Sequence, residues 1–241
     1  MSTFEITARP KMIFGLLLLA AFTIVLPGTA ANVITHQVIG NENHNIAKLM
    51  NRFDLANEPS LIQWYSTTTM LACSALLWTI ATYKQHSGGK YTMHWFGLAV
   101  IFLLFSIDEA IMLHEMLDKP FRQLLGAGGI LYITWVVPGA AFVLVVGITY
   151  FQFLLHLDRR SRRLFIAAGT IFITGALLME LPGGVLYEKY GFSTYHYITS
   201  YVVEELMETI GIALFIYTLL DYIDSNIGPI RFRVRRTGVA S

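Results

Sequence analysis

Six long apolar stretches constrain this chain more than any other feature of its sequence. They lie at about 12–34, 61–83, 93–117, 130–155, 164–187 and 196–222. A helix of roughly 20 apolar residues can cross the ~30 Å hydrocarbon core of a bilayer. Only 14% of the residues are charged, whereas soluble domains carry about 25%. The sequence therefore predicts an all-α, polytopic membrane bundle with six transmembrane helices.

The distribution of Lys and Arg predicts the orientation of these helices. With a cytoplasmic N-terminus, most of the 17 basic residues fall on the cytoplasmic side, including those of the loop DRRSRR at 158–163. Cytoplasmic loops of membrane proteins carry such an excess of basic residues. We therefore expect both termini in the cytoplasm, with 224–241 as a basic tail. No repeat or long linker divides the chain, so residues 1–241 are predicted to form one membrane domain.

Two other features have simple interpretations. The tail sequence RFRVRR resembles a nucleic-acid patch in isolation, but next to a helix end it is more typical of an anchor on anionic lipid. We expect no nucleic-acid partner. The single Cys73 cannot form an intramolecular disulfide and is predicted to pack inside the second span.

Ionisable residues inside three of the apolar stretches predict a polar site. They occur in SIDEAIMLHE of the third stretch, LLMELPGG of the fifth and YVVEELMET of the sixth. With the predicted orientation, all of them lie in the outer half of the membrane. These residues are Asp108, Glu109, His114, Glu115, Glu180, Glu204, Glu205 and Glu208.

Helical periodicity refines this picture. At 100° per residue, Asp108 and Glu115 share one face of a continuous third helix, with Glu109 and His114 flanking that face. In the sixth helix the residues of one narrow stripe are Tyr197, Tyr201, Glu204 and Glu208, with Glu205 at its edge. We expect these acidic faces to converge. Pro182, Gly183 and Gly184 are expected to end or break the fifth helix directly after Glu180, either as part of the site or as a simple helix stop.

Carboxylates gathered in a membrane must hold protons or bind cations. A set rich in oxygen ligands with one imidazole suits iron, manganese, calcium or zinc rather than copper(I). The candidate metal ligands are Asp108, His114, Glu115, Glu180, Glu204 and Glu208. Weaker candidates for the same site are Glu109, Glu205 and Tyr201.

Several other chemistries are not indicated. The chain lacks GxSxG, GxxxxGK[ST] and HExxH, and no span contains the lysine that retinal requires. Nothing signals a nucleotide, haem or flavin. The ferritin-like Glu-x-x-His pair is also missing, and Glu205-x-x-Glu208 is its nearest counterpart.

The combination of SIDEAIMLHE, DRRSRR, LLMELPGG and VVEELMETIGIALFIYTLLDYI resembles a group of uncharacterised bacterial integral membrane proteins. The resemblance covers most of the chain from about residue 93 onward. It implies an integral protein of the bacterial inner membrane and assigns no catalytic residue.

Three hypotheses for function follow. In the first, the acids bind one or two metal ions that act on a lipid-like substrate reached from the outer leaflet. In the second, the same acids form the relay of a small cation- or proton-coupled transporter. In the third, the protein is a subunit of a larger membrane complex. The sequence leaves open whether it is an enzyme and whether it forms oligomers.

Overall fold

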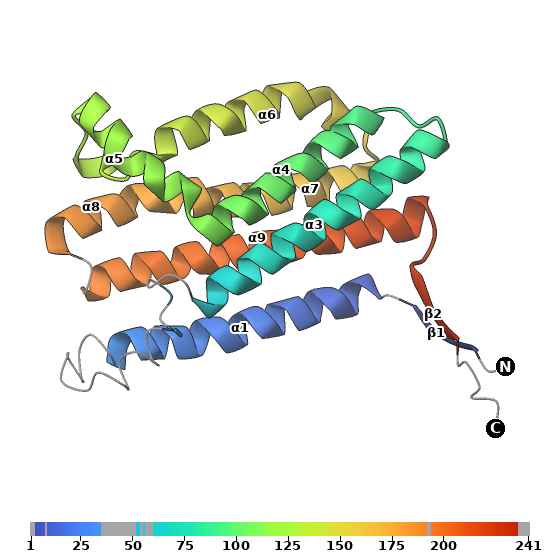
Figure 1. Ribbon diagram of the computed structural model, residues 1–241, viewed down its shortest axis with the longest axis horizontal. Helices are drawn as coiled ribbons and strands as arrows, with labels where there is room; N and C mark the ends of the chain where they lie inside the picture. Colours follow the sequence, from blue (N-terminus) through green and yellow to red (C-terminus); the bar gives the residue numbers. More distant parts are fainter. Residues whose placement is uncertain are drawn as a thin grey trace.

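Helices make up most of the chain that the structure describes (Figure 1). The computed structural model describes residues 3–7, 9–34, 52–53, 55, 60–191 and 194–235. The helical elements are α1 (Pro10–Ile34), α3 (Leu61–His86), α4 (Thr92–Ile111), α5 (Leu113–Leu125), η3 (Gly129–Leu131), α6 (Val136–His156), α7 (Arg159–Ile173), η4 (Thr174–Met179), α8 (Glu180–Tyr190) and α9 (Tyr195–Asn226). The predicted all-α bundle is thereby confirmed.

A short antiparallel ribbon joins the two ends of the bundle. Strand β1 (Thr3–Thr7) pairs with β2 (Arg231–Arg235), with Thr3 opposite Arg235 and Thr7 opposite Arg231. The sequence did not predict these strands. They place both described ends of the chain at the same end of the bundle (Figure 1). The predicted tail thus begins as the last turn of α9 and continues as β2, and its residues 236–241 lie outside the described part.

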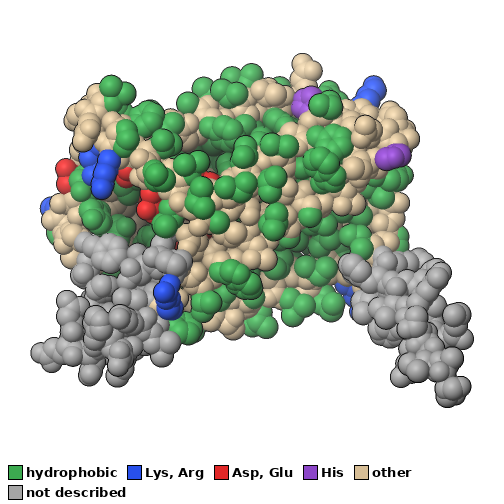
Figure 2. All heavy atoms as spheres, in the orientation of Figure 1, with side chains coloured by type: hydrophobic (Ala, Val, Ile, Leu, Met, Phe, Trp, Pro, Cys, Tyr) green, Lys and Arg blue, Asp and Glu red, His purple; other side chains and the backbone are tan. Residues whose placement is uncertain are grey.

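Five helical segments of the described residues are long and apolar enough to cross a membrane: Pro10–Ala31, Thr92–Ile111, Val136–His156, Arg159–Tyr190 and Tyr195–Asn226. Their outer surfaces carry large hydrophobic side chains such as Leu26 and Ile148, which are 67% and 70% exposed. Hydrophobic side chains cover much of the face drawn in Figure 2. This pattern is typical of a surface that contacts lipid tails.

Helix α3, predicted as another span, has 26 residues but is more polar than these five. Two of its buried polar residues bond to backbone carbonyls of α4. Ser74 Oγ donates to the carbonyl of Ala99 at 2.7 Å, and Gln63 Nε2 donates to that of Glu109 at 2.7 Å. In return, Ser106 Oγ of α4 donates to the carbonyl of Thr67 in α3 at 2.9 Å. Such bonds join membrane helices where hydrophobic attraction between them is weak.

Helix α9 lies at the centre of the bundle and contacts α1, α3, α7 and α8. Its buried residues join a core of aromatic and aliphatic side chains that includes Trp95, Phe153 and Leu219. Glycines allow α7 and η4 to approach α9 closely. A Cβ at Gly211 would lie 2.7 Å from the backbone nitrogen of Phe172, and one at Gly175 would lie 3.0 Å from the nitrogen of Glu208.

The third predicted span, 93–117, is not one helix. Helix α4 ends at Ile111, and Met112 adopts the left-handed conformation with φ 55° before α5 begins. Asp108 stabilises this break because its carboxylate accepts the backbone N–H of His114 at the start of α5, at 2.8 Å. Asp108 and Glu115 therefore do not share a helical face, and that prediction is wrong.

The predicted break after Glu180 is also wrong. The helix continues through α8 to Tyr190, and the irregular turn lies before Glu180, in the π-helical segment η4. Pro182 then lies in the first turn of α8. The N–H groups of a first turn have no acceptor within their own helix, so the N–H that proline lacks costs α8 no hydrogen bond. Gly184 serves close packing instead: a Cβ there would lie 3.3 Å from the nitrogen of Ile133.

Candidate functional site

Helices α5 and α8 lie at the same end of the bundle (Figure 1). Acidic side chains of α5, α8 and α9 approach one another there. Glu180, the first residue of α8, lies within electrostatic reach of Glu115 in α5 and of Glu204 in α9. Glu204 in turn lies within reach of Glu205 and Glu208. We call Glu115, Glu180, Glu204, Glu205 and Glu208 the acidic cluster. Glu115 is exposed, and the other four are half-buried.

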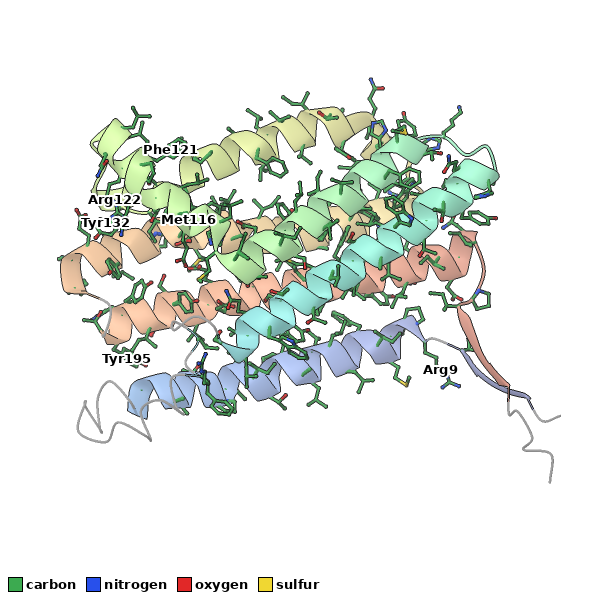
Figure 3. All side chains as sticks on the ribbon, in the orientation of Figure 1. Arg9, Met116, Phe121, Arg122, Tyr132 and Tyr195 are labelled. Atoms are coloured by element: carbon green, nitrogen blue, oxygen red, sulfur yellow. The ribbon has the colours of Figure 1, made fainter. Side chains whose placement is uncertain are left out.

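The surface view agrees with this placement. On the face drawn in Figure 2, acidic side chains are visible in the half of the bundle that carries α5 and α8. In Figure 3 the same end carries Met116, Arg122 and Tyr132, whereas Arg9 lies at the opposite end. The candidate site therefore belongs to the end of the bundle away from the β1–β2 ribbon.

Asp108 and His114 form an ion pair beside the acidic cluster. Asp108 Oδ2 lies 2.8 Å from His114 Nδ1, and its Oδ1 accepts the His114 backbone N–H. This geometry fixes the imidazole at the α4–α5 break and leaves its Nε2 as the atom that can face a ligand. Glu109, a weaker candidate, lies within electrostatic reach of His114, while its backbone carbonyl accepts the bond from Gln63.

Trp135 connects this ion pair to the acidic cluster. Its ring lies 4.8 Å, centroid to centroid, from the imidazole of His114. Its indole Nε1 donates to Glu180 Oε1 at 2.9 Å. The sequence alone does not reveal this contact, because Trp135 and Glu180 are 45 positions apart and become neighbours only in the folded chain.

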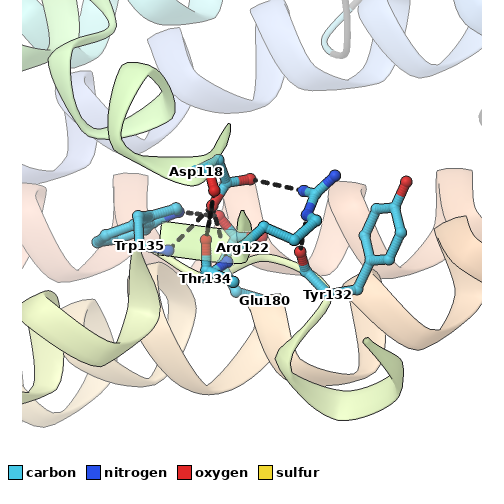
Figure 4. A network of polar contacts seen from close by, with 6 residues as sticks. All are labelled: Asp118, Arg122, Tyr132, Thr134, Trp135 and Glu180. Atoms are coloured by element: carbon cyan, nitrogen blue, oxygen red, sulfur yellow. Dashed lines mark hydrogen bonds and ion pairs between the residues drawn. The ribbon is translucent and has the colours of Figure 1, made fainter. Parts of the chain in front are cut away.

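Asp118 organises the start of α6 (Figure 4). Its Oδ1 accepts the backbone N–H groups of Thr134 at 2.7 Å and Trp135 at 2.9 Å. Its Oδ2 accepts from Arg122 Nη2 at 3.3 Å, and Arg122 Nε donates to the carbonyl of Tyr132 at 2.9 Å. The carboxylate caps a helix that lacks a capping side chain of its own.

Tyrosines line the same end of the bundle. Tyr197 lies within electrostatic reach of Glu115, Glu180 and Glu204. Its ring centroid lies 5.3 Å from that of Tyr187 and 6.3 Å from that of Tyr201. Tyr201 also packs against the hydrophobic side chains between α1 and α3, so it stands at the edge of the site.

Ser200 adds an unsatisfied hydroxyl beside the site. Its side chain is buried, with 8% of the residue exposed, and its Oγ has no hydrogen-bond partner among the described residues. The hydroxyl lies 3.7 Å from the position of a Cβ on Gly183, one helical turn beyond Glu180. A buried hydroxyl of this kind is ordinarily satisfied by water or by a ligand.

The described residues contain no group of three or more His, Cys, Asp or Glu side chains arranged to hold a metal ion. The predicted ligands are therefore neighbours rather than a closed coordination shell. Asp108, His114 and Glu180 already have protein partners, because Asp108 bonds to His114 and Glu180 accepts from Trp135.

His114 lies in α5, outside the membrane-spanning segments, and its protonation should respond to Asp108. Burial lowers the pKa of His114, but the hydrogen bond to Asp108 and the charges of Asp108, Glu109 and Glu115 outweigh it and raise the pKa from 6.5 to about 9. Because the folded pKa is raised, its contribution to stability is complete below pH 6.5 and is lost as the pH rises through about 9. Imidazole ¹⁵N NMR should find the midpoint near 9 in the wild type and a lower one in Asp108→Asn. Equal midpoints in the two proteins would contradict the pairing.

Fold and site together define a helical protein with the dimensions and hydropathy of an integral membrane protein. The chain belongs to the family described as domain of unknown function DUF8692, whose model matches residues 12–222. No curated protein and no solved structure matches it. The matched range includes every residue of the acidic cluster.

Proposed function

We propose that the protein is an integral protein of a bacterial inner membrane, with six spans including α3 and with both termini in the cytoplasm. The basic residues support this orientation. Those of α3, of the α6–α7 turn and of β2 lie at the end that carries the ribbon, which Figure 1 places opposite α5 and α8. An excess of Lys and Arg marks the cytoplasmic side. The acidic cluster then lies toward the outer surface.

We further propose that the protein acts by binding a cation at the acidic cluster. The observation that carries it is the approach of carboxylates from α5, α8 and α9 in a membrane-embedded bundle. Among the described residues no ion pair joins Glu180 or Glu204 to a Lys or Arg. Carboxylates placed in that way need bound protons or a cation to offset their charge.

Glu180, Glu204 and Glu208 would supply the central oxygen ligands of the cation, with Glu115 at the exposed edge. His114 Nε2 would complete the shell once the metal has displaced its proton, and Asp108 would hold the imidazole in position, as carboxylates do for histidine ligands. Oxygen ligands of this kind suit iron(II), manganese(II), calcium or zinc. The metal would act as a Lewis acid or water activator on a lipid-like substrate that enters from the outer leaflet.

Metal analysis of purified protein tests this proposal. We expect wild-type protein to bind metal stoichiometrically and Glu204→Gln to bind it roughly 10- to 100-fold more weakly, the loss that perturbing the surroundings of a metal site already produces. Asp224→Asn is the matched control, because Asp224 is exposed at the far end of α9. Wild-type protein that takes up none of the four metals at neutral pH would refute metal binding.

A second candidate, cation- or proton-coupled transport, rests on a different observation. The acids of α9 continue from the outer end to Glu208, where Gly175 of the π-helical turn η4 contacts the backbone of α9. π-Helical turns occur frequently at functional sites. Transport predicts cation or proton flux in proteoliposomes that falls to the level of empty liposomes in Glu204→Gln. Metal uptake without flux favours the first candidate, and flux without metal uptake favours the second.

A further inference from the structure

A shallow groove of about 420 Å³ lies at the opposite end of the bundle from the acidic cluster. Its walls come from the first turns of α7 and from the last turns of α9, and the residues that line it are Arg159, Arg160, Arg163, Leu164 and Tyr217. The α6–α7 turn that leads into it lies at the ribbon end of the bundle (Figure 1). Three guanidinium groups thus border one groove.

One of these arginines is held in place by α9. Arg160 Nε donates to Asp221 Oδ2 at 2.8 Å, and its Nη2 donates to Asp221 Oδ1 at 2.7 Å. The same Nη2 donates to the hydroxyl of Tyr217 at 3.1 Å. This bidentate pair neutralises Arg160 and fixes the wall of the groove. The Tyr217 hydroxyl accepts from Arg160 and keeps its own proton to donate.

The other two arginines carry uncompensated charge. Arg159 and Arg163 are exposed, and within the described ranges no hydrogen bond, ion pair or ring contact engages either guanidinium. They are four residues apart in α7, so both lie on the same helical face. Arg162, between them, is directed elsewhere, because its Nη1 donates to the carbonyl of Leu155. The groove therefore presents about two positive charges and a hydroxyl donor.

Apolar residues continue directly from the groove. Leu164 lies on its wall, and the Tyr217 ring lies 5.6 Å from that of Phe14 in α1. Below them, α7 continues as the apolar segment Arg159–Tyr190. A ligand with an anionic head and an acyl tail would match both parts, the head at the arginines and the tail along the helices.

We propose that this groove binds the phosphate of an anionic phospholipid from the adjacent leaflet. Arg159 and Arg163 bind the phosphate oxygens, Tyr217 donates to one of them, and Arg160 holds Tyr217 in place through its pair with Asp221. Guanidinium groups suit phosphate because their planar array of donors matches its oxygens. This inference is independent of the acidic cluster and of whatever that cluster binds.

The test measures lipid binding to the full chain in a neutral detergent by native mass spectrometry. Phosphatidylglycerol, phosphatidylcholine and inorganic phosphate are the three probes. We expect one phosphatidylglycerol to bind in preference to phosphatidylcholine, and we expect Arg159→Gln with Arg163→Gln to weaken it about 25-fold, or about fivefold for each basic residue removed. Arg162→Gln is the matched control and should stay within about twofold of the wild type, because its side chain lies off the groove.

Three outcomes of the lipid and variant comparisons would overturn the proposal. They are equal binding of phosphatidylcholine, an equal loss in the Arg162→Gln control, and unchanged binding in the double variant. Displacement of the lipid by an equal concentration of inorganic phosphate would assign the groove to a free anion and overturn the lipid assignment. If the double variant does not fold, the salt dependence of phosphatidylglycerol binding to the wild type serves as the test instead. Binding by exposed arginines must weaken as the ionic strength rises, and salt-independent binding would refute it.

Discussion

Replacement of Gly211 by alanine is expected to destabilise the bundle by about 3 kcal/mol, toward the upper end of the usual cost of overpacking. The added Cβ would lie 2.7 Å from Phe172 N, 2.8 Å from its Cα and 2.8 Å from its Cβ. Two of these atoms belong to the backbone, so no side-chain rotation relieves the overlap. Helices α7 and α9 must separate, which would also displace η4 from Glu208. Reversible unfolding in mixed detergent micelles would measure the loss.

Gly169→Ala is the control for this experiment. Gly169 lies in α7, and a Cβ there meets nothing within 4 Å. Alanine favours helix over glycine by about 1 kcal/mol, so this variant should be neutral or slightly more stable. Equal losses in the two variants would show that helix backbone effects rather than the contact with Phe172 are responsible.

Removal of the Asp118 carboxylate should have an effect of similar size. Asp118→Ala leaves the N–H groups of Thr134 and Trp135 and the guanidinium of Arg122 without their acceptor. Loss of one partner from a buried, hydrogen-bonded ion pair costs about 3–5 kcal/mol. Because the Asp118 side chain is 21% exposed, we expect a loss of about 3 kcal/mol. The α6 start should also loosen, and hydrogen exchange at Thr134 and Trp135 would report it directly.

Asp118→Asn separates the two roles of this side chain. An amide oxygen can still accept from both N–H groups, whereas the ion pair with Arg122 is lost. A loss of about 1 kcal/mol is therefore expected. Should Asp118→Asn be as damaging as Asp118→Ala, the capping bonds would not be the main contribution of Asp118.

Span positions followed from sequence because hydropathy and length are local properties. The predicted segments 12–34 and 196–222 correspond closely to α1 and α9, whereas α6 begins only at Val136, later than the predicted 130–155. The ends of the third and fifth spans were predicted less well. Local rules treated 93–117 as continuous and Pro182 as a helix terminator. The α4–α5 break depends on the hydrogen bond that the His114 backbone N–H donates to Asp108. The tolerance of Pro182 depends on a π-helical turn. Neither feature appears in a hydropathy pattern.

The residues of the candidate site were recognisable individually, since charged side chains stand out in apolar sequence. Their partners were not. Trp135 joins His114 to Glu180, and Asp118 caps α6, through contacts that span 45 and 17 positions. Ser200 was missed for a similar reason: only the folded chain shows that its hydroxyl is buried without a partner.

The sequence by itself determined that the chain is helical, apolar and acidic in three of its segments, because composition and periodicity follow directly from residue order. Tertiary structure alone decided how those segments meet. Gly175 and Gly211 bring η4 and α7 against α9, and the turn at Met112 directs α5 toward α8. Which carboxylates become neighbours depends on these close approaches and on one left-handed residue, since a displacement of one helical turn would separate them.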